Sequence, residues 1–444
     1  MIIFQLWEVF MNEIEKYLCE KDSYHAINDV LNEITLHDRQ CVDIVKFLYA
    51  ERSMFLYDTG TGKTLIAAAI MKMLKHANPG MFSVMIVLKD QLLQTPDKLK
   101  RYADLKVLTT YADSTYVGKN FINQNLTDYD VVMITEECLL NKRVMDYLYS
   151  YRDKMISVII DEAHKLNNFN SARSASMLRA LLSKVRYACA LTATPIVTSS
   201  FQLSRLAHLL RPERYPNPKR LAQDLESKRF SIEQDPFFFI NRKASEFGRT
   251  STPNGHVIAV SPSPSQSECN CGGVKLFQIC KGYGAVNQVQ ALEELVNEHG
   301  GVPGLIFISQ GSIIEWVSAN FKKNEIDFEV IDGETSIQER TRITSRFASG
   351  DCKLVITSLT TALDLDCDYV VFYEFTVEVE QMIGRAHRGL GNKELDVYFI
   401  ITENTPEVTY FMENIVPRCK LIEDILSKKN TAIEAVTRGL ELEC

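Results

Sequence analysis

The run Met54-Phe-Leu-Tyr-Asp-Thr-Gly-Thr-Gly-Lys-Thr64 joins a short apolar strand to a glycine-rich turn, and a helix-patterned segment follows at 65–74. Gly60 and Gly62 let the backbone curl so that successive N–H groups point at phosphate oxygens at a helix N-terminus. Lys63 supplies a positive charge for the β- and γ-phosphates, and Thr64 stands where a Mg²⁺ ligand is needed. This stretch predicts an α/β fold with a phosphate-binding turn, whose candidate residues are Thr59, Gly60, Thr61, Gly62, Lys63 and Thr64.

One position departs from the usual pattern of this turn. The pattern G-x₄-G-K-T has glycine where this chain has Tyr57. Taken alone, the stretch is also compatible with a glycine-rich strand-to-helix turn that binds nothing. The rest of the chain has to decide between the two interpretations.

The same order of apolar strand, turn and amphipathic helix occurs in two parts of the chain, and it is typical of open parallel sheets covered by helices. The first part has expected strands at 54–57, 84–88, 131–134, 156–160 and 187–191. The second part has them at 305–309, 328–331, 354–357, 369–373 and 397–401. We predict a helical preface at 1–35, domains at 36–210 and 285–403, a proline-rich connector at 211–284 and closing helices at 404–444.

The composition is that of a globular protein of two or three domains. The chain has 444 residues, 46% of them hydrophobic, with 49 Lys and Arg against 57 Asp and Glu and a net charge of −8. Residues 1–11 lack a basic region and include Glu8, and no window approaches the ~20 apolar residues that span a bilayer. We expect a soluble intracellular protein without a membrane partner. Nucleus, cytoplasm and virion are not distinguished.

Eleven cysteines are too dilute for a disulfide framework, which agrees with a reducing compartment. Cys269, Cys271 and Cys280 have a spacing that can supply three zinc ligands, but no fourth Cys or His is near. Ordinary loop thiols are the favoured interpretation.

Two carboxylates end another apolar strand, in the run Val158-Ile-Ile-Asp-Glu-Ala-His164. In open α/β sheets this is the edge where ligands bind. Asp161 can hold Mg²⁺ while Glu162 takes a proton from the attacking water. A simple helix N-cap is the alternative. A later strand ends in Thr192-Ala-Thr-Pro195.

A pair of arginines lies far along the second domain, in Gln381-Met-Ile-Gly-Arg-Ala-His-Arg388. Arg385 and Arg388 are three residues apart and therefore neighbours on one helix face. Two guanidiniums so placed can reach a γ-phosphate across a cleft. A solvated basic helix face is the alternative.

Taken together, these motifs resemble a superfamily 2 helicase or translocase, in which two tandem recombinase-A-like domains hold ATP in a cleft between them. The Swi/Snf-like translocases and the related nucleoside triphosphatases of large DNA viruses are the most similar branch. The segments follow the family's order: Leu36–Gln40 the adenine segment, Asp58–Thr64 motif I, Asp161–His164 the DEAH form of motif II, Thr192–Pro195 motif III, Gly304–Gln310 motif IV, 358–365 motif V and Gln381–Arg388 motif VI.

The resemblance implies a role for each matching residue, with ATP and Mg²⁺ as cofactors. The implied catalytic residues are Lys63, Glu162, Gln381, Arg385 and Arg388. Gln40 and Asp364 are added to the nucleotide-binding residues. Thr64 and Asp161 are the implied ligands of the metal. The residues implied to couple ATP hydrolysis to nucleic-acid binding are His164, Thr192 and Thr194. The residues implied to contact nucleic acid are Lys89, Thr135, Thr357 and Ser358. Motif V lacks the family's usual glycines.

The expected function is therefore an ATP-dependent motor on nucleic acid, with DNA favoured over RNA and with transcription or replication proteins as candidate partners. The segment 211–249 has nine Lys or Arg against six Asp or Glu and is rich in Phe, so it can line a backbone-tracking groove or pack as core. Two alternatives remain: an RNA helicase, and an ATP-switched subunit of a transcription complex that does not move.

Overall fold

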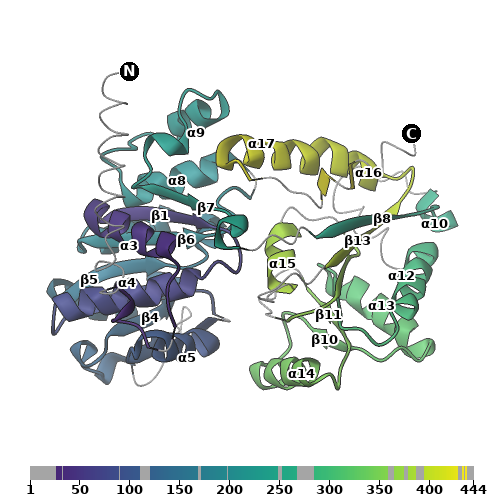
Figure 1. Ribbon diagram of the computed structural model, residues 1–444, viewed down its shortest axis with the longest axis horizontal. Helices are drawn as coiled ribbons and strands as arrows, with labels where there is room; N and C mark the ends of the chain where they lie inside the picture. Colours follow the sequence, from purple (N-terminus) through teal and green to yellow (C-terminus); the bar gives the residue numbers. More distant parts are fainter. Residues whose placement is uncertain are drawn as a thin grey trace. The chain divides into compact units, whose positions relative to one another are not determined.

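The computed structural model describes residues 27–32, 34–89, 91–110, 121–168, 172–197, 199–248, 253–267, 285–358, 365–374, 379–386, 395–428, 433–434 and 436–437. The chain divides into two units, Met1–Lys243 and Ala244–Cys444 (Figure 1). Cys269, Cys271 and Cys280, and most of the predicted helical preface, lie outside the described residues. Among the described helices, none has both the length and the apolar composition needed to cross a membrane.

The first unit is built on a parallel sheet whose described strands run in the order β3-β4-β2-β5-β6-β1-β7. Every residue of β2 and β5 is buried, because both faces of a central parallel strand are covered. The strands are β1 Arg52–Tyr57, β2 Phe82–Val87, β3 Val107–Thr110, β4 Val131–Thr135, β5 Met155–Ile160, β6 Tyr187–Thr192 and β7 Phe239–Arg242.

Helices follow most of these strands. Their bounds are α3 Asp38–Ala50, α4 Lys63–Ala77, α5 Gln91–Ala103, α6 Lys142–Ser150, α7 Ala172–Leu182, α8 Ser200–Leu210 and α9 Pro218–Glu226. Short 3₁₀ turns lie at Phe121–Asn123, Leu126–Asp128, Glu136–Leu140, Arg152–Lys154, Ala163–Asn168, Ile232–Gln234 and Ala244–Phe247.

One arginine ties two helix ends to the amino end of β1. Arg52 Nη1 donates to Leu210 O at 2.9 Å, and Nη2 donates to Leu182 O at 2.8 Å and Val185 O at 3.0 Å. The carbonyls of Leu210 and Leu182 are at the C-terminal ends of α8 and α7, where a cation also interacts favourably with the helix dipole, and Val185 lies in the segment after α7. Burial lowers the pKa of Arg52.

We expect Arg52→Met to destabilise the first unit by roughly 2–3 kcal/mol, because three carbonyls lose a charged donor. Urea denaturation followed by far-UV circular dichroism checks this as a lower midpoint. Arg186→Met is the matched control, since Arg186 pairs with Glu51 on the surface at 2.6 Å and exposed pairs stabilise little. Equal midpoints for the two variants would contradict the role given to Arg52.

The segment predicted as a connector, 211–284, is divided between the two units. Its first part contains α9 and β7, and β7 pairs in parallel with β1. The side chains of Phe237, Phe238 and Phe239 are buried, and Ser53 Oγ donates to Phe237 O at 2.6 Å. These three side chains thus form core, which is one of the two interpretations that the sequence leaves open. The physical reason is that packing of the aromatic rings, such as Phe238 and Phe239 on Tyr215, removes their apolar surface from water.

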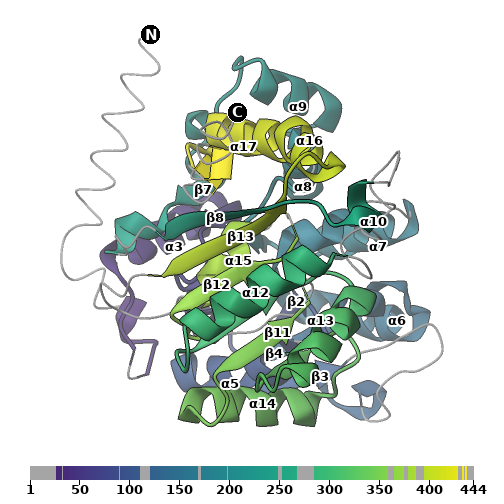
Figure 2. The same ribbon diagram turned by 90° about the vertical axis from the view of Figure 1, so that its right-hand side faces the viewer.

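The second unit has a parallel sheet whose described strands run in the order β10-β11-β9-β12-β13-β8 (Figure 2). The strands are β8 Asn254–Val260, β9 Gly304–Phe307, β10 Glu329–Ile331, β11 Leu354–Thr357, β12 Tyr369–Phe372 and β13 Asp396–Thr402. The helices are α10 Pro264–Ser267, α12 Val286–Glu298, α13 Gly311–Lys323, α14 Ile337–Ser349, α15 Val379–Ala386, α16 Pro406–Tyr410 and α17 Val416–Leu426, with a π-helical turn at Phe411–Ile415.

Two hydrophobic clusters cover the two faces of this second sheet. One joins α12 and α13 to it through residues such as Leu292 and Val317. The other joins α14 and α15 through residues such as Phe347 and Met382. The predicted fold class, two tandem α/β domains on parallel sheets, is confirmed for both units.

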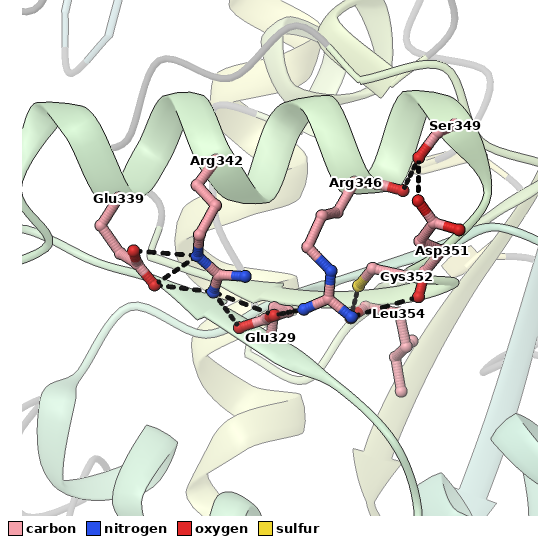
Figure 3. Close-up of polar contacts among 8 residues, drawn as sticks. All are labelled: Glu329, Glu339, Arg342, Arg346, Ser349, Asp351, Cys352 and Leu354. Carbon is pink, nitrogen blue, oxygen red and sulfur yellow. Dashed lines mark hydrogen bonds and ion pairs between the residues drawn. The ribbon is translucent and has the colours of Figure 1, made fainter.

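A network of ion pairs joins α14 to Glu329 of β10 (Figure 3). Arg342 Nη2 lies 3.1 Å from Glu329 Oε1 and 2.7 Å from Glu339 Oε1, and Arg346 also pairs with Glu329. Hydrogen bonds to Glu339 and Glu329 raise the pKa of Arg342. Both arginines therefore bind acids of their own unit.

Candidate nucleotide-binding site

The turn between β1 and α4 has the backbone that its glycines predict. Gly60 and Gly62 have φ of 77° and 88°, in the left-handed region that favours glycine. Thr61 Oγ1 donates to Asp58 O at 2.6 Å, which closes the turn. Gly62 is the N-cap of α4, so no side chain covers the first amides of the helix. Those amides are suited to bind an anion.

Lys63 folds back over this turn. Its Nζ donates to Tyr57 O at 3.2 Å and to Asp58 O at 3.3 Å. The ammonium group thus lies beside the N-terminus of α4, where phosphates would bind. Thr64 is the next residue of the helix.

Gln40 reaches the turn from α3. Its Nε2 donates to Thr61 O at 2.9 Å, and its Oε1 accepts from His37 N at 2.8 Å. A Cβ added at Gly62 would lie 2.7 Å from Gln40 Nε2. Glycine at this position is therefore favoured by its φ, and a larger residue would also have to displace the amide of Gln40.

The acidic pair lies at the carboxyl end of β5. Asp161 and Glu162 are only 6% and 8% exposed, and Glu162 has a φ of 46°, which is unusual for a residue with a side chain. Asp161 Oδ1 accepts from Glu162 N at 2.9 Å. Burial and the charge of Glu162 raise the pKa of Asp161 to about 6, while Lys63 acts in the opposite direction. This end of the sheet has excess negative charge, which favours a cation.

The predicted coupling residues form a connected chain behind the acids. His164 Nδ1 lies 2.9 Å from Thr192 Oγ1 and 3.4 Å from Glu162 Oε2. Thr192 Oγ1 accepts from Thr194 N at 3.2 Å. The end of β6 is therefore joined through His164 to the carboxylate of Glu162.

One residue of the site was not predicted from the sequence. Gln91, the first residue of α5, donates from Nε2 to Asp161 Oδ2 at 3.1 Å and accepts from Leu88 N at 3.0 Å. Gln91 thereby orients the carboxylate expected to hold Mg²⁺. Its position just after the turn that follows β2 is the only signal in the sequence.

Tyr57 explains the departure from the usual pattern of the turn. It is the last residue of β1, is fully buried, and donates its hydroxyl to Asp43. Position 57 belongs to the strand and not to the curled part of the loop, so glycine is not needed there.

The predicted nucleic-acid residues lie at the carboxyl edges of the two sheets. Lys89 follows β2 and is exposed, whereas Thr135 at the end of β4 is 1% exposed. Thr357 at the end of β11 is fully buried, and Ser358 N donates to Ile331 O at 3.2 Å. Of the four, Lys89 is the one whose side chain is exposed to solvent in this structure.

The predicted residues of motif VI are described only in part. Gln381 and Arg385 lie in α15, and the positions of their side chains are not described. Asp364 and Arg388 lie outside the described residues. Their roles remain predictions.

Comparison with known proteins finds two domain families. Residues 37–235 match the SNF2-related domain, and residues 287–389 match the helicase conserved C-terminal domain. Nucleoside triphosphatase I of Choristoneura biennis entomopoxvirus is 30% identical over 206 residues, and that of Choristoneura fumiferana entomopoxvirus is 30% identical over 205. Each alignment covers 42% of this chain and only 28% of the relative's length.

A solved structure, the Sulfolobus solfataricus SWI2/SNF2 ATPase core in complex with dsDNA, aligns with 92% of this chain and 97% of its own. Its TM-score is 0.43 and its sequence identity is 18%. The two domain matches cover six of the seven described strands of the first sheet and four of the six of the second, in the order that the motifs predict. The chain therefore belongs to the superfamily 2 helicases and translocases, in the Swi/Snf-like branch with relatives among viral nucleoside triphosphatases.

Proposed function

We propose that the chain is a nucleic-acid-dependent ATPase that uses ATP hydrolysis to move along double-stranded DNA. The observation that carries this proposal is the convergence of Gln40, Lys63, Asp161 and Glu162 from three separate segments at one end of the first sheet. The match of the second unit to a helicase C-terminal domain supports a motor over a simple nucleotide-binding module.

The donor atoms of the site suit ATP with Mg²⁺. Magnesium is usually held by one or two carboxylates together with substrate phosphates. Asp161 offers a buried carboxylate in an environment with excess negative charge, and Thr64 offers a hydroxyl at the start of α4. When bound, Mg²⁺ would neutralise charge on the phosphates. Lys63 and the first amides of α4 would hold the same phosphates from the protein side.

Hydrolysis in this scheme depends on Glu162, which accepts the proton of the attacking water. His164 Nδ1 lies 3.4 Å from Glu162 Oε2, and Thr192 Oγ1 lies 2.9 Å from the same nitrogen. Arg385 and Arg388 of the second unit stabilise the charge that develops on the γ-phosphate, so the two units have to close on the nucleotide. Repeated closing and opening of the two units would move the protein along the nucleic acid.

The test is an ATPase assay with duplex DNA, single-stranded DNA and RNA as activators. We expect duplex DNA to stimulate hydrolysis most, and Lys63→Ala to remove activity with every activator. If RNA stimulates most, the protein is an RNA helicase. If none stimulates while ATP still binds, the protein is an ATP-switched binding subunit.

A second measurement tests whether the protein binds DNA mainly through its phosphates. Phosphate contacts release counterions, so binding that neutralises 6–10 phosphates weakens by about 10³–10⁵ between 50 and 200 mM salt. We expect a steep loss of affinity despite the net charge of −8, with little dependence on base sequence. Fluorescence anisotropy with two unrelated labelled duplexes measures both. Salt-insensitive binding to only one duplex would argue for a sequence-specific factor.

A further inference from the structure

A buried carboxylate in α3 joins three segments beside the nucleotide site. Asp43 is fully buried. Arg242 donates to it with two nitrogens, Nε to Oδ2 at 2.8 Å and Nη2 to Oδ1 at 2.7 Å. Tyr57 donates its hydroxyl to the same Oδ2. Such a two-pronged pair between a guanidinium and a carboxylate fixes orientation as well as distance. We call Asp43, Tyr57 and Arg242 the Asp43 cluster.

Each member of the Asp43 cluster is one step from a residue of the site. Asp43 follows Gln40 by three residues on α3, so the two lie on neighbouring positions of one helix face. Tyr57 O accepts from Lys63 Nζ. Arg242 O accepts from Asp58 N at 3.2 Å, at the first residue of the phosphate-binding turn.

We propose that the Asp43 cluster is a positioning device for ATP binding, which holds Gln40 and the phosphate-binding turn in a fixed relative arrangement. This inference rests on the proposed function. The links from Asp43 and Arg242 to the site run through Gln40, through Tyr57 and through the backbone of Asp58. Loosening the cluster lets the adenine segment and the turn shift independently, which weakens nucleotide binding more than it changes the chemical step.

The Asp43 cluster acts through its location and not through the stability of a buried ion pair. Buried ion pairs often contribute little net stability, because desolvation opposes the attraction between the charges. They do impose a single geometry on the groups around them. Here the carboxylate accepts hydrogen bonds from the ends of β1 and β7 while it is anchored in α3. Gln40 and the turn meet within this frame, with Gln40 Nε2 2.9 Å from Thr61 O.

The first unit contains a matched control for this cluster. Tyr215 OH donates to Asp235 Oδ2 at 2.5 Å, and Arg214 Nε lies 2.6 Å from the same oxygen. Asp235 is buried and precedes β7, so this second set of three residues lies at the amino end of the strand whose carboxyl end carries Arg242. It has the same chemistry without a link to the phosphate-binding turn.

The experiment compares Tyr57→Phe with Tyr215→Phe in the full chain, by steady-state hydrolysis of ATP and GTP. We expect Tyr57→Phe to raise KM for ATP roughly tenfold with kcat within about twofold, since a hydrogen bond to a buried charge is lost. The preference for ATP over GTP should fall as well, because Gln40 is the residue expected to contact adenine. Tyr215→Phe should leave KM and the ATP preference within about twofold of the parent values. Equal KM values for the two variants would overturn the inference.

A binding measurement keeps this test separate from the test of the motor. Equilibrium titration with a fluorescent ATP analogue needs no hydrolysis. Arg242→Lys keeps the positive charge but loses the planar guanidinium. It should lower the affinity for the analogue, as Tyr57→Phe should. If the parent chain binds the analogue but does not hydrolyse ATP, the proposed function fails while the positioning role is still measured. If the parent chain hydrolyses ATP and both variants bind the analogue as tightly as it does, the positioning role alone fails.

Discussion

Arg388→Ala should reduce ATP hydrolysis by about 10³–10⁵-fold while ATP binding to the first unit stays within about twofold. An arginine finger contributes that much in related phosphoryl-transfer systems, because it stabilises charge that develops only in the transition state. Arg388 lies outside the described residues, so this experiment tests a role that rests on the sequence. Single-turnover hydrolysis and titration with a fluorescent ATP analogue measure the two quantities separately.

Two controls sharpen the result for Arg388. Arg388→Lys should restore little activity, since an ammonium group cannot replace the planar fork. Arg342→Ala removes an arginine of the same unit that binds Glu329 and Glu339, and turnover should be unchanged. A chain that ends at Lys243 keeps β7 and the whole first sheet. If that shorter chain hydrolysed ATP as fast as the full chain, residues of the second unit would have no catalytic role.

Glu162→Gln should reduce hydrolysis by about 10²–10⁴-fold, because an amide cannot accept the proton of the attacking water. The substitution keeps the shape of the side chain, so nucleotide affinity should be retained. The hydrogen-bonded contact between His164 and Thr192 does not involve the changed atoms and should also persist. The measurements are kcat with saturating duplex DNA and, separately, the affinity for ATP in the presence of Mg²⁺ without nucleic acid.

Glu137→Gln is the matched control for Glu162→Gln, since Glu137 is an exposed acid that follows the end of β4 in the same sheet, with β2 between β4 and β5. It should leave both kcat and affinity unchanged. A collapse of nucleotide affinity in Glu162→Gln would assign Glu162 to metal binding or folding in place of proton transfer.

The strands of the fold were predictable where an apolar run ends abruptly in polar residues. All ten expected strands are present, such as β2 and β5, which are buried along their whole length. Three strands were not predicted. Most residues of β3 and β8 are only partly buried or exposed. Their sequences contain threonine, asparagine and histidine among the apolar residues. β7 was assigned to the connector because prolines surround it, although its partner β1 lies far earlier in the chain.

The candidate site was predictable as far as its chemistry follows from local spacing. Lys63, Asp161 and Glu162 belong to short motifs, and they lie at the start of α4 and just after β5, while their roles stay predictions. Gln91 and Arg242 belong to no such motif, and their contacts are made across 70 residues to Asp161 and across 199 residues to Asp43. Contacts of that separation depend on the folded sheet, and a single sequence holds no local pattern for them.

The edge strands β7 and β8 also determine the order in which the protein can fold during synthesis. In the first unit β1 pairs with β7. Met54 can pair with Phe239 only after the 185 residues up to that position have been synthesised (239 − 54). In the second unit β8 pairs with β13. Asn254 can pair with Asp396 only after the 142 residues up to that position have been synthesised (396 − 254). Such long-range pairing makes folding slow, because the loop must close before the contacts form. The first unit has all its strands once Arg242 has left the ribosome, and it can fold while the second is still being made. β8 then stays without its partner strand β13 until the last strand of the second sheet has been synthesised, and an unpaired strand can pair with another chain.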